Sequence, residues 1–203
     1  MRSGVSVLFA LLVGCVACAG PLTSSRPRAP LPEPGYHTEY LPVWIDAKFS
    51  DKEKGDIRAA LDAWDTALNG YAQFIVVSDK IDRPADDPAV TIRRLISKQG
   101  LTFNREPMSP ETLDTPELAH YDPDADNIMV LSDRIGFRDL HIIMMHEIGH
   151  YFISPPVMHV LIKGSLMFPS YDFQPACVDK VTAMYVGEVQ KWDWRHMVYC
   201  EIP

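Results

Sequence analysis

The chain has 203 residues, 47% of them hydrophobic, and a formal net charge of −8 at pH 7. This length and composition fit one globular domain with short appendages. The acidic balance, in a sequence without a basic patch, excludes nucleic acid as an expected partner.

The first residues have the organisation of an export signal. Arg2 supplies a positive charge, and residues 5–13 form an apolar stretch that is too short to cross a bilayer as a mature helix. The stretch ends in Leu12-Val13-Gly14-Cys15, which resembles a bacterial lipoprotein signal in which Cys15 becomes the lipidated N-terminus. We therefore expect a lipid anchor that holds the protein at a membrane.

Two other interpretations of this segment remain open. Cys18 is a poorer candidate for lipidation, because the leucine is missing upstream of it, and an ordinary secretory signal would be cut near Ala19. In each case the protein leaves the cytosol. Val16, rather than Asp, follows Cys15, which favours the outer membrane within the cell envelope, and a secreted protein is the alternative.

Three parts of the chain are expected: a signal peptide over residues 1–14, a tether over residues 15–39 and a folded domain over residues 40–203. Prolines at positions 21, 27, 30, 32 and 34 predict an extended tether. Such a tether lets a lipid-anchored domain stand away from the membrane. We expect the domain to be a monomer.

The domain is predicted to begin with a strand over residues 41–45 and a helix over residues 51–68. Ser50 and Glu53 form the pattern of a capping box at the start of the helix, and Asn69-Gly70 is a typical helix end. Apolar residues recur through the helix at the spacing of one face: Ile57, Leu61, Trp64, Ala67 and Leu68.

Further strands are predicted over residues 74–77, 90–96 and 128–131, with a loop punctuated by prolines over residues 101–126. Helices over residues 137–152 and 178–189 complete the domain. This order predicts an α/β (α+β) fold, in which a sheet is backed by the first of these two helices and the second lies near the C-terminus.

Asp122, Asp124 and Asp126 stand near the end of the predicted loop. Alternating carboxylates suggest a calcium site. An EF-hand loop, however, would need Gly at position 127 and Glu at position 133, where this chain has Asn and Asp. A solvated acidic turn before the next strand is therefore the better interpretation.

The predicted helix at residues 137–152 carries the motif His146-Glu147-Ile148-Gly149-His150. The two histidines of an H-E-x-x-H motif are four residues apart, so they lie on one face of a helix and can hold one zinc ion. Glu147 could then take a proton from the zinc-bound water. The motif predicts a zinc hydrolase and, among hydrolases, favours a peptidase.

A catalytic zinc ion needs a third protein ligand, with the fourth position open to water. The downstream candidates are His159, Asp172, Asp179, Glu188 and His196.

The segment from Asp139 to His150 resembles the active-site helix of the metzincin peptidases, in particular that of the matrixin-like group. Residues 164–171 are similar to the Met-turn of that family and the Pro-x-Tyr that follows it, and residues 179–184 are similar to the start of its closing helix. The resemblance covers roughly residues 127–190. It implies a zincin-like fold with a twisted mixed sheet, a Zn²⁺ cofactor and endopeptidase activity.

The family motif H-E-x-x-H-x-x-G-x-x-H is not complete in this chain. Ile153 and Pro156 stand where the family has Gly and His. His159 comes three residues later, but it precedes Met167 by eight residues, which is the family's spacing. An insertion of three residues explains both facts, and Ser154-Pro155-Pro156 would end the helix as glycine does in the family. The resemblance therefore implies that His159 is the third ligand.

The same resemblance implies roles around the zinc ion. Met167 would form an apolar floor, and Pro169 and Tyr171 would shape the pocket for the substrate side chain after the scissile bond. The strand at residues 128–131 would be the sheet edge on which an extended peptide pairs. Glu188 on the last helix is the rival third ligand, which would make the site that of a gluzincin-type hydrolase.

We therefore expect a zinc endopeptidase that acts on a peptide or protein substrate. The alternative is a non-catalytic zinc-binding surface lipoprotein, because residues 155–158 of the altered loop could cover the cleft. The cysteine motif that blocks the zinc ion in matrixin propeptides is not found in this sequence.

Cys177 and Cys200 are expected to form a disulfide in an oxidising compartment. This bond would tie the C-terminal tail to the domain. Zinc ligation by these cysteines is the competing interpretation, but the pair is widely separated in the sequence and lacks a C-x-x-C pattern.

Overall fold

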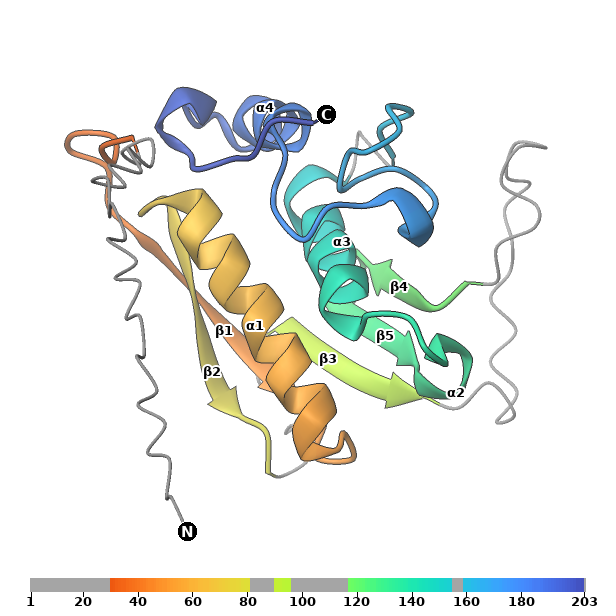
Figure 1. The fold of residues 1–203 in the computed structure, drawn as a ribbon. Helices are drawn as coiled ribbons and strands as arrows, with labels where there is room; N and C mark the ends of the chain where they lie inside the picture. The colour runs from red at the N-terminus through yellow and green to blue at the C-terminus, as the bar shows by residue number, and fades with distance from the viewer. Residues whose placement is uncertain (1–29, 81–89, 96–116, 155–158, 203) are drawn as a thin grey trace, which may run out of the picture.

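The computed structural model describes residues 30–80, 90–95, 117–154 and 159–202. A twisted sheet forms one layer of the domain, and two long helices cover one of its faces (Figure 1). The predicted signal peptide, Cys15, Cys18 and residues 15–29 of the predicted tether lie outside the described residues. So do most of the predicted loop at residues 101–126 and residues 155–158 of the altered loop.

The sheet has five strands in the order β2-β1-β3-β5-β4. Neighbouring strands are parallel except for β4 and β5, which pair antiparallel, so the sheet is mixed. The predicted α/β (α+β) class is therefore confirmed. The strands are β1 (Glu39–Ile45), β2 (Ala72–Ser78), β3 (Val90–Leu95), β4 (Ala119–Asp122) and β5 (Asn127–Leu131).

Helix α1 (Asp51–Leu68) has the predicted bounds. The Ser50 side chain accepts the backbone N–H of Glu53, and the Glu53 side chain accepts the backbone N–H of Ser50, which completes the capping box. Asn69 ends the helix in the left-handed region, with φ of 50°. The apolar face of α1 is buried against the sheet and against the second long helix.

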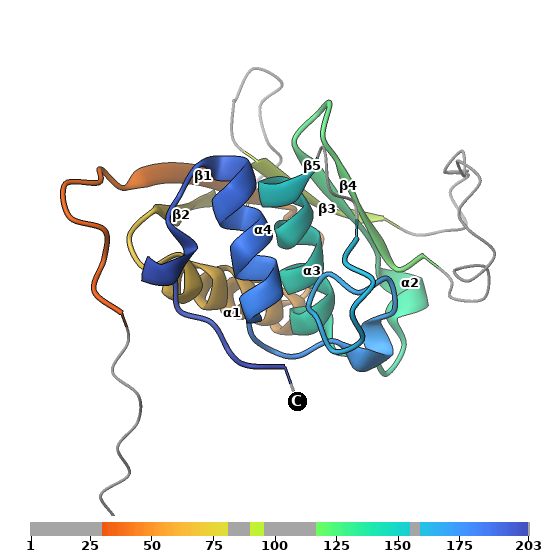
Figure 2. The ribbon, with the colours of Figure 1, turned by 90° about the horizontal axis from the view of Figure 1, so that it is seen from above.

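Helix α3 (Leu140–Ile153) carries the H-E-x-x-H motif and begins three residues later than predicted. Asp139 is extended and its side chain accepts the backbone N–H of His141, so the helix starts after this N-cap. The indole N–H of Trp64 on α1 donates to the carbonyl of Met145 at 2.8 Å. This buried bond joins the two helices, which lie side by side over the sheet (Figures 1 and 2).

Helix α4 (Lys180–Gln190) lies across the ends of α1 and α3 (Figure 2). The tail after it returns to the domain, where the backbone N–H of Val198 donates to the carbonyl of Ala67 at 2.8 Å. Cys177 and Cys200 are joined by the predicted disulfide. Two short 3₁₀ helices flank α4: η3 (Tyr171–Phe173) and η4 (Trp194–His196).

Strand β4 was not predicted, and it corrects the expected edge of the sheet. The prediction that residues 128–131 form the edge is wrong, because β5 lies between β3 and β4. Ala119 and Tyr121 are buried at alternate positions of β4, as a half-buried strand requires. The short helix α2 (Ser132–Ile135), which follows β5, was not predicted either.

The turn between β4 and β5 contains the three aspartates that suggested calcium. Asp124 and Asp126 are exposed, and the backbone N–H of Asp124 donates to the Asp122 carboxylate at 3.0 Å. Among the described residues, this trio does not form a cluster that could hold a metal ion.

The described end of the predicted tether lies against the domain. The Asn69 side chain donates to the carbonyl of Pro30 at 2.8 Å, and the Tyr71 hydroxyl donates to the Glu33 carboxylate at 2.6 Å. These contacts hold residues 30–39 beside the start of β1. Within the described ranges, each helix is too short or too polar to span a lipid bilayer.

Candidate metal centre

Three histidine side chains converge at the C-terminal half of α3. One ligand nitrogen from each of His146, His150 and His159 lies within 4.8 Å of the other two. The Nε2 atoms of His146 and His150 are 3.1 Å apart, and the His159 ring centroid lies 5.3 Å from that of His146 and 4.9 Å from that of His150. The three predicted ligands are therefore brought together.

His146 and His150 are placed by the helix, but His159 is placed by a later turn. Helix α3 ends at Ile153 with Ser154 as its C-cap, and the backbone N–H of Val160 donates to the carbonyl of Met167 at 2.8 Å. Val160 is itself buried in the core. The turn that ends at Met167 therefore holds the third histidine against the helix.

The neighbours of His146 determine which of its ring nitrogens carries hydrogen. Nδ1 lies 2.7 Å from the carbonyl oxygen of Leu166, which can only accept, so Nδ1 is the protonated nitrogen and donates to it. Nε2 is then left with a lone pair that faces the other histidines. His150 is oriented in a similar way, because its Nδ1 lies 3.4 Å from the Ser154 hydroxyl oxygen. Contacts of this kind orient metal-binding histidines.

Gln174 is a neighbour of the cluster that the sequence did not reveal. Its amide nitrogen donates to the carbonyl of Phe168 at 2.6 Å and lies 2.8 Å from His146 Nδ1, a contact between two donors because Nδ1–H is directed to Leu166. The side chain is buried, and its Oε1 has no hydrogen-bond partner in the described structure. Gln174 follows η3 without a recognisable motif around it, so pattern and spacing could not have identified it.

Burial makes these histidines good ligands. Desolvation, followed by the nearby His159, lowers the pKa of His146 to about 3. Burial also lowers the pKa values of His150 and His159. Neutral imidazoles at pH 7 offer lone pairs, and two lone pairs that face each other at 3.1 Å repel unless a proton or a cation lies between them.

The donor set therefore fits a divalent cation. Three neutral imidazoles suit zinc, and also copper, iron and nickel, so the ligand set does not fix the identity of the metal. What the geometry establishes is a histidine triad, with His146 and His150 buried and His159 half-buried, that could hold a metal ion.

Glu147 is buried beside this triad, with 2% of its surface exposed. The Tyr171 hydroxyl donates to Glu147 Oε1 at 2.7 Å. Desolvation raises the pKa of Glu147 to about 7, although the bond from Tyr171 and the positive field of His120 oppose the rise. The site thus combines three neutral nitrogen ligands with a carboxyl group that titrates near neutral pH.

Met167 lies under α3, where the Met-turn prediction expected an apolar floor. Its side chain is fully buried, and a Cβ atom added to Gly149 would lie 2.3 Å from the Met167 sulfur. Gly149 therefore permits the close approach of the Met167 side chain to the helix. The turn also contains Leu166, whose carbonyl orients His146.

The other candidate ligands lie apart from the triad. Glu188 and Asp172 are exposed, and neither belongs to the described metal-binding cluster. Asp179 is fully buried, but it caps α4 and accepts the backbone N–H groups of Val181 and Thr182. His196 on η4 interacts with the carbonyl of Leu31 at 2.8 Å.

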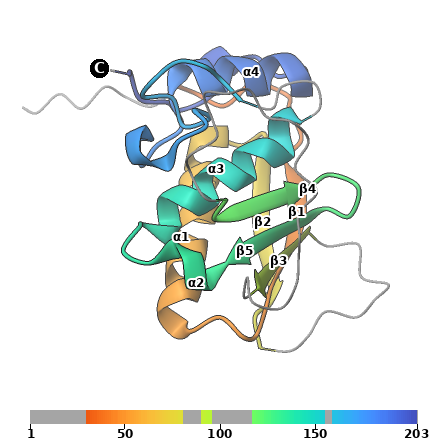
Figure 3. The ribbon, with the colours of Figure 1, turned by 90° about the vertical axis from the view of Figure 1, so that its right-hand side faces the viewer.

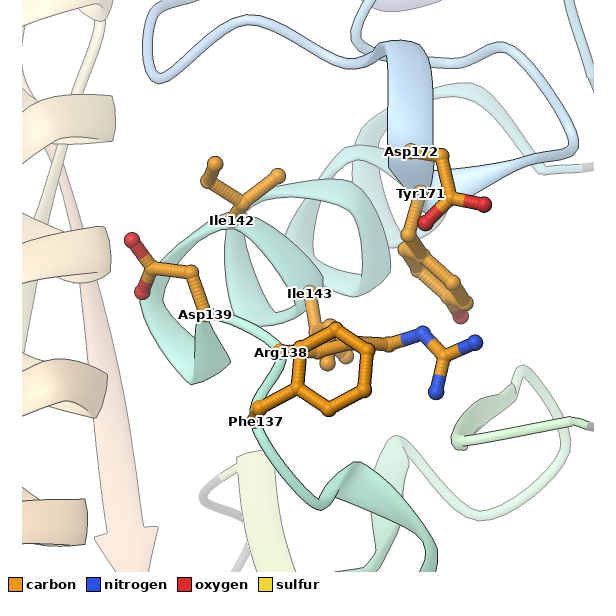
Figure 4. A pocket seen from close by; sticks show the side chains of 7 residues that line it. All are labelled: Phe137, Arg138, Asp139, Ile142, Ile143, Tyr171 and Asp172. Atoms are coloured by element: carbon orange, nitrogen blue, oxygen red, sulfur yellow. The ribbon is translucent and has the colours of Figure 1, made fainter.

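A pocket of about 180 Å³ opens between the start of α3 and η3 (Figure 4). Tyr171 is one of its lining residues, whereas Pro169 is half-buried and does not line it. The lining residues are Phe137, Arg138, Asp139, Ile142, Ile143, Tyr171 and Asp172.

Comparison of the chain with protein-family models and with curated proteins finds no match.

Proposed function

We propose that the protein is a zinc-dependent endopeptidase of the metzincin type. The observation that carries this proposal is the convergence of His146, His150 and His159 beside the buried carboxyl group of Glu147. Metal-binding hydrolases need this combination of three protein ligands and a nearby base. The Met-turn resemblance and the position of Met167 under Gly149 support the same assignment.

A divalent cation bound by the triad would act as a Lewis acid and lower the pKa of a water molecule. Glu147 is suited to receive the proton that this water loses, because a general base works best when its pKa lies near the working pH. The same carboxylic acid can then give the proton to the leaving amine nitrogen. The carboxyl group thus carries one proton from water to product and returns to its starting state.

Strand β4 is the proposed binding edge for the peptide. It is the last strand of the sheet and runs alongside α3 (Figure 3). In the described part of the chain, its outer side is not paired with another strand. An extended substrate can therefore add to the sheet here and lay its scissile bond across the helix that bears the histidines.

The proposed setting is the cell envelope, with the domain held by a lipid on Cys15. This part of the proposal rests on the sequence of the export signal. The proposed enzyme acts as a monomer on peptide or protein substrates.

The test is peptide cleavage by the purified domain, loaded with zinc and offered a library of unstructured peptides. Cleavage by the wild type is expected to stop with a chelator and to fall by orders of magnitude in Glu147→Gln, which should keep its zinc. Glu188→Gln, which alters an exposed glutamate on α4, is the matched control and should cleave normally. If the zinc-loaded wild type cleaves no peptide, the result would favour the alternative of a non-catalytic metal-binding protein. An active Glu147→Gln would refute the role of the carboxyl group.

A further inference from the structure

Tyr171 lies at the border between the histidine triad and the pocket. Its ring meets the ring of His146 edge-on, with 5.3 Å between the centroids and 70° between the planes. Figure 4 shows the side chain descending from η3 toward the side chains at the start of α3. The Tyr171 side chain therefore contacts the metal site and also lines the pocket that a substrate side chain would enter.

The hydroxyl group of Tyr171 already has a hydrogen-bond acceptor. It donates to Glu147 Oε1 at 2.7 Å, which is a normal length for a phenol and a carboxylate. The direction of the bond follows from chemistry, because an ionised carboxylate can only accept. One of the two oxygens of the proposed base is therefore anchored from outside its own helix.

We propose that Tyr171 is a positioning residue for Glu147. The hydroxyl binds Oε1 from η3, and a backbone hydrogen bond from Tyr121 on β4 also acts on this carboxyl group, so Tyr171 helps to fix the orientation in which the carboxyl group exchanges a proton with water. This inference rests on the proposed peptidase function. It adds a second role to the one implied by the family resemblance, since the ring forms a pocket wall while the hydroxyl orients the base.

The two roles can be separated by one substitution. Tyr171→Phe keeps the ring, and with it the pocket wall and the edge-on contact with His146, but removes the donor. A small misplacement of a reacting group lowers turnover more than it lowers substrate binding. We therefore expect kcat to fall about tenfold while KM changes by less than about twofold. Zinc affinity should stay at the wild-type value, because the hydroxyl does not touch the ligands.

Tyr71→Phe is the matched control. It removes another hydrogen bond from a buried phenol to a carboxylate, that of Glu33 at 2.6 Å, in the part of the domain where the N-terminal segment packs. It should lower stability without changing kcat. Tyr171→Phe with wild-type kcat would overturn the inference, and so would a variant in which only KM rises, because the hydroxyl would then serve substrate binding.

A second measurement does not depend on activity. In metal-free protein with tyrosine labelled by ¹³C at Cζ, the resonance of Tyr171 reports on its hydroxyl bond. Glu147→Gln is expected to move this resonance and to leave that of Tyr71 in place, and an unmoved Tyr171 resonance would contradict the contact. If Tyr171→Phe does not fold, this spectrum still tests the hydrogen bond between Tyr171 and Glu147. A wild type without peptidase activity would refute the proposed function, whereas an active wild type with an equally active Tyr171→Phe would refute only this inference.

Discussion

The carboxylate of Asp179 accepts the backbone N–H of Leu166 at 2.7 Å, and the carbonyl of the same Leu166 accepts the Nδ1–H of His146 at 2.7 Å. Two short bonds thus connect the N-terminus of α4 to a ring of the histidine triad. Asp179 also accepts the hydroxyl of Ser165 at 3.0 Å, so it holds the whole turn that precedes Met167. The C-terminal part of the chain therefore orients a side chain that the central helix supplies.

Asp179→Asn tests this connection. If the amide group replaces Oδ2, a donor faces the N–H of Leu166, and that buried group loses its acceptor. We expect the free energy of unfolding to fall by about 2–4 kcal/mol and zinc affinity to fall about tenfold to hundredfold. Chemical denaturation and zinc titration measure the two effects. Asp193→Asn, at the N-cap of η4, is the control and should leave zinc affinity unchanged; an equal loss in both variants would mean that Asp179 does not act through His146.

Gly149→Ala tests the close packing of the Met167 turn on α3. The added methyl group would lie 2.3 Å from the Met167 sulfur and 3.4 Å from the Trp64 ring, so the fully buried Met167 side chain must move. Overpacking of this kind costs about 1–3 kcal/mol of stability. Gly55→Ala is the matched control within a helix, because nothing lies within 4 Å of its added Cβ, and it should gain about 0.5–1 kcal/mol. Equal behaviour of the two variants in urea denaturation would contradict the packing.

The buried carboxyl group of Glu147 should make the stability of the metal-free protein depend on pH. Folding raises its pKa from 4.5 to about 7, so the folded state binds this proton more tightly than the unfolded state. A raised carboxyl pKa stabilises the folded protein below pH 4.5, and this contribution is lost as the pH rises through 7. Each pKa unit is worth about 1.4 kcal/mol, so the loss amounts to about 3 kcal/mol.

Glu147→Gln isolates this effect, because an amide stays neutral at all pH values. The variant should match the wild type near pH 4.5 and exceed it by about 3 kcal/mol at pH 8, in urea denaturation with a chelator present. Protonation of His146, His150 and His159 occurs in both proteins, whereas the carboxylate of Glu147 also raises the pKa of His120 in the wild type alone. A difference that does not change between the two pH values would show that the carboxyl group is not buried.

Local patterns in the sequence were enough to predict α1 to the residue. Ser50, Glu53 and Asn69 act through backbone groups within a few positions of themselves, so the sequence alone fixes both ends of the helix. The two histidines of α3 and the third at position 159 were predicted for different reasons. His146 and His150 lie four residues apart on one helix, whereas His159 was implied by the resemblance to the matrixin-like Met-turn, with Glu188 as its rival, and the structure brings the three rings together.

Features that depend on distant contacts were not predictable in this way. Strand β4 has only four residues and follows a segment rich in prolines, and its place at the sheet edge depends on antiparallel pairing with β5. Gln174 reaches His146 across a separation of 28 residues, and Tyr171 reaches Glu147 across 24. Such contacts are set by how α4 and the Met167 turn pack on α3, which periodicity does not encode.

Zinc binding by three proteins tests the central claim most directly: the wild type, His159→Ala and Glu188→Gln, each purified without a histidine tag and titrated with zinc. The wild type should bind one zinc ion per chain. His159→Ala should lose more than about 100-fold in affinity, and Glu188→Gln should bind as the wild type does, because the third ligand comes from the Met167 turn and not from α4. Wild-type affinity in His159→Ala, together with a loss in Glu188→Gln, would contradict the histidine triad.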